Sequence, residues 1–143
     1  MGVVSRVSTS TSSRFDLSWT ALSTPNNGGS PITSYFLEWD AGTSGATWTE
    51  IVGFSPSQTA TTYSVTGGSS GLTVGRLYGF RVSASNIFGW GPVSTVSYLK
   101  AAQAPSVSTS VVTSIDPVTG GVVIQWAAPT TNGDSIQSYT INI

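Results

Sequence analysis

Cysteine and histidine are both absent from the 143-residue chain, and charged residues are scarce. Without these two residue types, most nucleophile–base pairs and the usual zinc ligand sets are excluded. Charged side chains make up 8% of the chain, against about 25% in ordinary soluble domains, and the net charge is −1. We therefore expect no basic surface for nucleic acid. No apolar run approaches the roughly 18 residues of a membrane-spanning helix.

Hydroxyl side chains take the place of the missing charges. The chain has 25 serines and 20 threonines. This high hydroxyl content has two explanations. Threonine is favoured in β-strands, and serine and threonine are the acceptors of O-glycosylation on an extracellular surface. No Asn-x-Ser/Thr site occurs, so N-glycosylation is not expected. The first residues lack a signal-peptide pattern. Three explanations fit this: the signal was removed, the chain is a piece of a longer protein, or the protein is intracellular.

Apolar and polar residues alternate along seven short segments separated by turn residues. This period of two predicts strands with one buried face. In the third strand Phe36, Glu38 and Asp40 should point outward, and in the last Val96 and Tyr98 should point inward. A Gly/Ser connection is expected at 67–71. The predicted strands are 3–8, 15–19, 32–40, 47–51, 61–66, 78–84 and 93–99.

The stretch from residue 71 to residue 94 carries the most specific pattern. Leu72 is followed by a glycine turn, Tyr78 begins an alternating strand, and Asn86 opens an Asn-x-x-Gly-x-Gly-Pro loop. This order resembles the end of a fibronectin type III domain. The resemblance implies an all-β, immunoglobulin-like sandwich and a tyrosine corner, in which the hydroxyl of Tyr78 bonds the backbone upstream. The expected core residues are Trp19, Tyr35, Leu72, Tyr78, Phe80, Trp126 and Tyr139.

The sequence begins the same pattern again after Pro105. The run ending in Trp126 repeats the run ending in Trp19, and residues 136–141 repeat residues 32–37. Repetition at this spacing indicates tandem domains. We expect one domain at 1–100, a short semi-rigid linker at 101–105, and strands A to C of a second, incomplete domain at 106–143.

Two groups of residues are candidate chemical sites. Glu38 and Asp40 lie two residues apart on one strand, but glycosidase carboxylates usually face each other across a cleft. Pairing of Glu38 with Arg81 on the neighbouring strand explains this position better. The Asn132-Gly133-Asp134 run has too few oxygen ligands for calcium and is commoner as a turn. We therefore expect no enzyme activity, no metal and no cofactor.

Four aromatic residues are the candidate interface. Phe88 and Trp90 lie in the loop before the last strand, where aromatics often anchor a contact. Phe36 points outward on its strand and Trp48 lies on the adjoining edge, so the two can form a docking patch.

The leading hypothesis is a structural or adhesive module of an extracellular or cell-surface, repeat-built protein. Its partners are proteins, either neighbouring domains or copies of itself. The alternatives are an accessory domain of a secreted multidomain enzyme and a receptor-type ligand-binding domain. The second domain needs further strands, supplied either by more chain or by another subunit through self-assembly.

Overall fold

A computed structural model describes residues 2–66 and 71–142, so most of the expected Gly/Ser connection at 67–71 lies outside the described residues. Strands separated by turns make up the regular structure of these residues. The described residues contain no helix that is long and apolar enough to cross a membrane. The strands are β1 (Ser5–Arg6), β2 (Arg14–Ser18), β3 (Ser34–Trp39), β4 (Thr49–Val52), β5 (Thr62–Thr66), β6 (Leu77–Asn86), β7 (Gly89–Trp90), β8 (Ser97–Lys100), β9 (Val112–Ile115) and β10 (Val122–Gln125).

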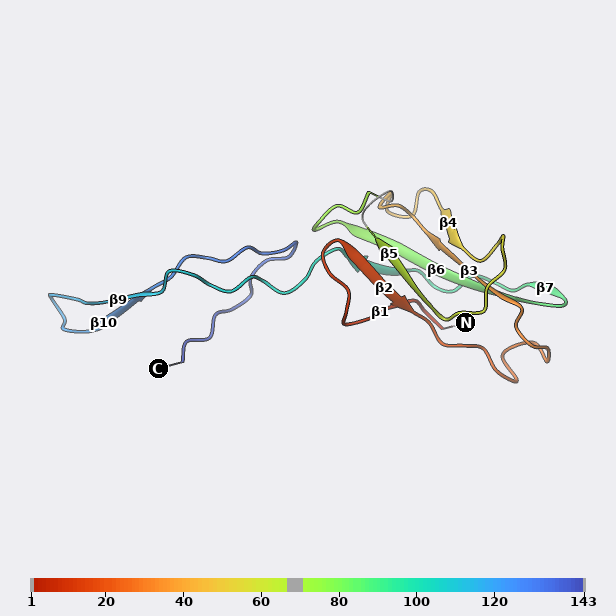
Figure 1. Ribbon diagram of the computed structural model, residues 1–143, viewed down its shortest axis with the longest axis horizontal. Coiled ribbons are helices and arrows are strands. Elements are labelled where there is room, and N and C mark those ends of the chain that lie inside the picture. The colour runs from red at the N-terminus through yellow and green to blue at the C-terminus, as the bar shows by residue number, and fades with distance from the viewer. Residues whose placement is uncertain (1, 67–70, 143) are drawn as a thin grey trace.

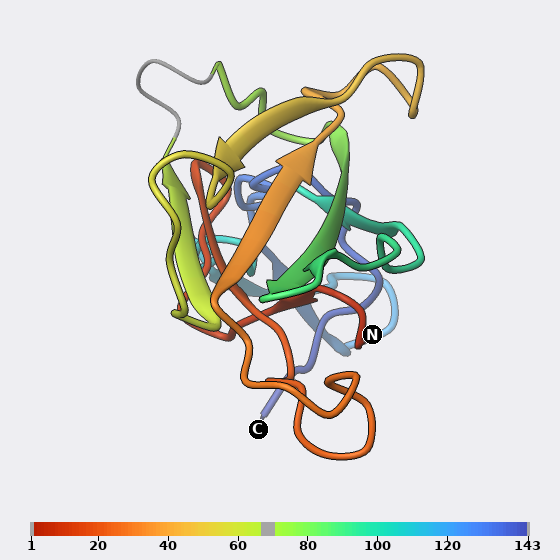
Figure 2. The same ribbon diagram turned by 90° about the vertical axis from the view of Figure 1, so that its right-hand side faces the viewer.

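The first eight strands form a sandwich of two antiparallel sheets. One sheet has the order β1-β2-β5, and the other has the order β4-β3-β6-β7 with β8 also paired to β6. Viewed along the long axis, β3 and β6 lie side by side while β2 and β5 face them (Figure 2). The fold class expected from the alternating pattern is therefore confirmed for this part of the chain.

The core lies between the two sheets and contains the inward positions of the alternating strands. Phe15 is its centre: its ring meets Tyr78 at 5.9 Å and Phe80 at 5.3 Å between centroids, both edge to face. Leu72 is partly buried against this cluster. Such aromatic pairs add about 0.5–1.5 kcal/mol beyond their burial. The buried core residues are Val4, Phe15, Leu17, Trp19, Tyr35, Leu37, Trp39, Val65, Tyr78, Phe80, Val82, Ala84 and Ala101.

The tyrosine corner expected at Tyr78 is formed. Its hydroxyl accepts a hydrogen bond from the Thr73 backbone N–H at 2.7 Å and donates to the Gly71 carbonyl at 3.3 Å. The ring itself is buried and stacks on Trp39 at 5.5 Å. One side chain thus joins the core to the turn that precedes β6.

Tyr78→Phe should lower the free energy of unfolding by about 1–3 kcal/mol, because the Thr73 N–H loses its acceptor while the ring remains packed. The midpoint of urea unfolding measures this. Tyr98→Phe is the matched control, since Tyr98 lies on the exposed face, and it should change stability by less than about 0.5 kcal/mol. Equal midpoints for the two variants would show that the corner contributes nothing.

The last strand of the sandwich is in the opposite register from the one expected. Val96 and Tyr98 are exposed rather than buried, and Leu99 packs against the core. The reason is the pairing of Tyr98 with Gly79 of β6, an outward position. The side chains of Val96 and Tyr98 lie over Gly79, and each has an atom about 3.1 Å from the position that a Cβ on Gly79 would take. An apolar residue can therefore occupy the outer face because a glycine beneath it leaves room.

Residues 106–142 form a separate arm that extends from one end of the sandwich (Figure 1). Within it, β9 and β10 pair as an antiparallel hairpin. The strand expected at residues 136–141 is not formed, since its counterpart β3 is held by β4 and β6 and no such neighbours lie beside it in the described residues. Tyr139 is 44% exposed and Trp126 is half-buried, whereas both were expected in a core, because no second sheet of the described residues covers them.

Candidate functional site

Three aromatic rings meet on the outer face of the larger sheet. The ring centroids of Phe36 and Phe54 are 5.5 Å apart, those of Phe36 and Trp90 5.7 Å, and those of Phe54 and Trp90 5.8 Å. Phe54 is 60% exposed and Trp90 41%, while Phe36 lies half-buried beneath them. We call these three residues the aromatic cluster. An apolar group of this kind held at the surface is the usual mark of an interaction site.

The strand register explains why these rings converge. Phe36 of β3 pairs with Ser83 of β6, and Trp90 of β7 pairs with Ser85. The two serines are small, so the large rings on either side can lean over β6 and touch. Gly89, at φ 118°, makes the tight turn that returns Trp90 to the sheet.

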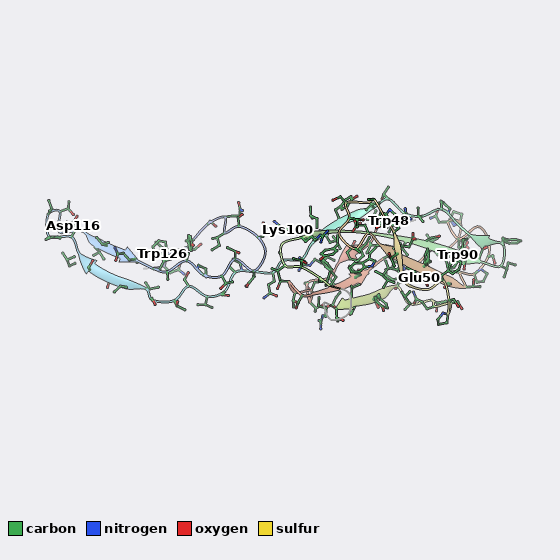
Figure 3. The ribbon with its side chains drawn as sticks, turned by 90° about the horizontal axis from the view of Figure 1, so that it is seen from above. Trp48, Glu50, Trp90, Lys100, Asp116 and Trp126 are labelled. Carbon is green, nitrogen blue, oxygen red and sulfur yellow. The ribbon has the colours of Figure 1, made fainter. Side chains whose placement is uncertain are left out.

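A cation–π pair extends the aromatic surface along the same face. The Arg81 guanidinium lies 4.0 Å from the centroid of the Trp48 ring, and its Nε donates to Glu38 Oε2 at 2.8 Å. The cross-strand pairing of Glu38 with Arg81 therefore matches the expectation from the sequence. Trp48 and Trp90 lie on the sandwich at separate points of the larger sheet (Figure 3). Trp48 is half-buried by this stacking.

Phe54 was missed by the sequence analysis, and Phe88 lies apart from the cluster. Phe54 follows β4 in a loop, where no alternation indicates its direction. The presence of a phenylalanine in an otherwise polar loop was the one sequence feature that could have indicated Phe54.

Phe88 is 81% exposed beside a hollow of about 360 Å³ at the end of the sandwich, which we call the end hollow. It is lined by Leu22, Asn26, Asn27, Gly28, Ile32, Ala84, Asn86, Phe88, Gly89, Trp90, Gly91 and Pro92.

Glu38 and Asp40, the two candidate catalytic carboxylates, have different structural partners. Glu38 is hydrogen-bonded to Arg81. Asp40 was expected to point outward into solvent, but it is buried, with 1% of its surface exposed. Asp40 accepts hydrogen bonds from the backbone N–H groups of Gly42, Gly45 and Gly79 at 2.8–2.9 Å. The chain turns back over this side chain after β3, which buries it. Among the described residues, no group of three or more acidic residues could hold a metal ion.

A second set of contacts joins the sandwich to the C-terminal arm. Lys100 Nζ donates to Asp134 Oδ1 at 2.6 Å, and the Gln103 N–H donates to the Asn132 carbonyl at 3.1 Å. The bond from Lys100 lowers the pKa of the Asp134 carboxyl from its usual value. Lys100 lies at the boundary between sandwich and arm (Figure 3). We call this contact region the joint.

The linker within the joint is held on its other side as well. Arg6 donates from its guanidinium to the carbonyls of Lys100 and Ala102, and the Ser12 N–H donates to Gln103 Oε1 at 3.0 Å. Ala101 and Ala102 are buried. The short connection is therefore fixed by hydrogen bonds between side chains and backbone rather than left as a free tether.

Residues 4–100 match the family described as Fibronectin type III domain, which is more than half of the chain. No curated protein matches it significantly. Among solved structures, a crystal structure of titin domains is 27% identical, with a TM-score of 0.52 over 71% of this chain. The chain spans only 30% of the length of that titin structure.

Two further structures share the fold at lower identity. The sixth fibronectin type III domain of human fibronectin type III domain containing protein 3 is 21% identical, with a TM-score of 0.55, over 76% of this chain and 90% of that one. The FN1 to FN3 domains of chicken CNTN1 are 18% identical, with a TM-score of 0.51, over 89% of this chain and 41% of that one. Such domains are commonly structural or adhesion modules, generally non-catalytic, that mediate protein contacts. The chain belongs to the fibronectin type III domain family.

Proposed function

We propose that this chain is a non-catalytic structural and adhesive module of an extracellular, repeat-built surface or fibre protein. The aromatic cluster is the observation that carries the adhesive part. Its exposed rings are pre-packed against one another, so little side-chain freedom remains to be lost on binding. The scarcity of charge and the hydroxyl-rich surface favour the extracellular setting.

The proposed partner of the aromatic cluster is a copy of the same chain. A net charge of −1 produces little repulsion between copies. Among the described residues of this face, the charges beside the cluster are the paired Glu38 and Arg81 and also Glu50, whose carboxylate accepts from the Phe54 N–H at 3.0 Å. Two such faces can therefore meet without burying an unpaired cation.

Spacing between domains is the second proposed role, and the joint supports it. A linker bonded on both sides holds neighbouring modules at a set distance. The same property suits the accessory domain of a secreted enzyme. The receptor-type alternative rests on Phe88 and the end hollow, which are open to solvent.

We also propose that residues 106–143 are the first strands of a second module. Within the arm, Trp126 and Tyr139 meet at 5.4 Å, much as Trp19 and Tyr35 meet at 6.1 Å in the sandwich. The β9–β10 hairpin corresponds to the pairing of β1 with β2. Its bare apolar side would be closed by strands from further chain or from another subunit.

Beads coated with the purified chain test the adhesive role. Wild-type beads should cluster, and the double variant Phe54→Ser, Trp90→Ser should cluster far less, because interface anchors typically contribute about 2 kcal/mol or more, a factor of about 30 in affinity. The control is Val107→Ser with Val118→Ser, two exposed apolar residues of the arm. Clustering that persists in the Phe54/Trp90 variant, or that never occurs, would contradict the proposal; urea unfolding checks that each variant is folded.

A further inference from the structure

The joint depends on a loop with two consecutive residues of positive φ, and another such pair stands at the corresponding position of the sandwich. In the arm, Asn132 and Gly133 have φ of 52° and 99°, and Gly133 lies six residues before Tyr139. In the sandwich, Gly28 and Gly29 have φ of 68° and 75°, and Gly29 lies six residues before Tyr35. Since Tyr139 repeats Tyr35, the two loops are equivalent positions of the internal repeat.

In the arm this loop is pressed against the sandwich so closely that only glycine fits. A Cβ on Gly133 would lie 2.7 Å from the Ala101 carbonyl oxygen and 2.9 Å from the Gly75 nitrogen. It would also lie 2.9 Å from Cγ1 of Val74, which belongs to the turn before β6. The joint is therefore a backbone-to-backbone contact between a glycine loop and the opposite end of the preceding domain.

In the sandwich the equivalent loop has no such neighbour. A Cβ on Gly29 would meet no atom within 4 Å in the part of the chain that the structure describes. The loop projects beyond the sheets (Figure 2) and, with β7, lies at the end of the sandwich farthest from the arm (Figure 1). The end hollow opens beside it and includes Gly28. The positive φ of Gly29 favours glycine by itself, and the open space at its Cβ position leaves the backbone free to be approached closely, as Gly133 is in the arm.

We infer that the loop at residues 26–30 is a docking surface for another fibronectin type III module, which presents the turn before its sixth strand and the end of its last strand. The partner's equivalents of Gly75 and Ala101 would lie against Gly29, and its equivalent of Val74 would enter the end hollow. This inference rests on the proposed spacing role and on the proposed second module; of the aromatic cluster, only Trp90 also lines the end hollow.

The chemistry of the partner follows from the loop's own residues. Ser30, which is buried, stands where the arm has Asp134, so no ion pair like Lys100–Asp134 forms and the contact should be insensitive to salt. A second copy of this chain does not fit as the partner, because its corresponding end is already covered by its own residues 132–134. The partner is therefore a module whose corresponding end is free.

A duplicated chain provides that free end. The repeat period is 107, from Trp19 to Trp126, so a copy of residues 1–107 is placed directly before the full chain. Backbone nitrogen-15 relaxation then reports whether the two complete sandwiches tumble together. We expect a single correlation time in the unmodified duplicate. Gly29→Ala in the downstream copy should separate the two values, because its Cβ would occupy the contact.

Two variants guard against a trivial loss of folding. Gly120→Ala is the matched control, since Gly120 also has a positive φ, 69°, and open space around its Cβ, but lies in the β9–β10 turn. It should leave the sandwiches coupled. Val74→Asp in the upstream copy attacks the partner's side of the contact and should uncouple them without touching the loop.

Independent tumbling of the unmodified duplicate would overturn the inference, as would equal behaviour of Gly29→Ala and Gly120→Ala. A shift in coupling between low and high salt would contradict the uncharged contact. Coupled tumbling together with beads that fail to cluster would support this inference while rejecting the adhesive role, so the two failures are distinguishable.

Discussion

Asp40→Ala is expected to lower the free energy of unfolding by about 3 kcal/mol or more. The side chain is 1% exposed and accepts from the N–H groups of Gly42, Gly45 and Gly79. Alanine would leave these donors without an acceptor, and a buried unsatisfied donor costs about 1–3 kcal/mol. The loss should appear as a lower urea midpoint, followed by tryptophan fluorescence.

Asp16→Ala is the matched control for this prediction. Asp16 accepts from the hydroxyls of Ser64 and Thr9 and from Arg14, and these bonds are exposed. The hydrogen bond from Ser64 is the largest of the effects that lower its pKa to about 2. Water can replace the carboxylate for all three partners, so the loss should be clearly smaller than for Asp40. Similar losses at both positions would mean that burial of Asp40 has no special importance.

Gly53→Ala is expected to destabilise the sandwich by about 3 kcal/mol or more. Gly53 has φ 104°, and a Cβ there would lie 1.7 Å from the carbonyl oxygen of Tyr35. The backbone strain and the overpacking each cost about 1–3 kcal/mol. To relieve the clash, the segment after β4 must move away from β3. This should also break the bond from Ser34 Oγ to the Gly53 carbonyl, now 2.7 Å long.

The experiment compares thermal unfolding of Gly53→Ala with that of Gly71→Ala. Gly71 also has a positive φ, 66°, but a Cβ there would meet no atom of the described residues within 4 Å. Only the conformational strain of about 1–2 kcal/mol then remains. If the two variants unfold at the same temperature, the close approach of Gly53 to β3 is not real. A displaced Phe54 should also alter Trp90 fluorescence in Gly53→Ala alone.

Much of the sandwich could be predicted from the alternation of apolar and polar residues along each strand. The alternation at Phe15 and Leu17, and again at Tyr78 and Phe80, correctly placed these residues in the core. Period-two alternation assigns side chains to faces wherever one face is buried. The tyrosine corner was readable because it links Tyr78 to a turn only a few residues upstream.

The candidate site was only partly readable. Phe36 and Trp90 could be named as surface aromatics, but Phe54, which completes the aromatic cluster, belongs to a loop without periodicity. The burial of Asp40 depends on the chain folding back over it and on the missing side chain of Gly79, where a Cβ would lie 3.0 Å from Asp40 Oδ2. Contacts between segments far apart in the chain leave no local signal.

The sequence by itself determined the class of fold and the inward face of most strands, because these depend on periodicity and on turn residues. The repeat after Pro105 stays a prediction from the same kind of pattern. Only the tertiary structure decided the exposure of Val96 and Tyr98, the engagement of Gly133 and the openness of Gly29. The two glycines have equivalent positions in the repeat and a similar backbone conformation. What distinguishes them is the surface that lies opposite each one, and that surface comes from another part of the fold.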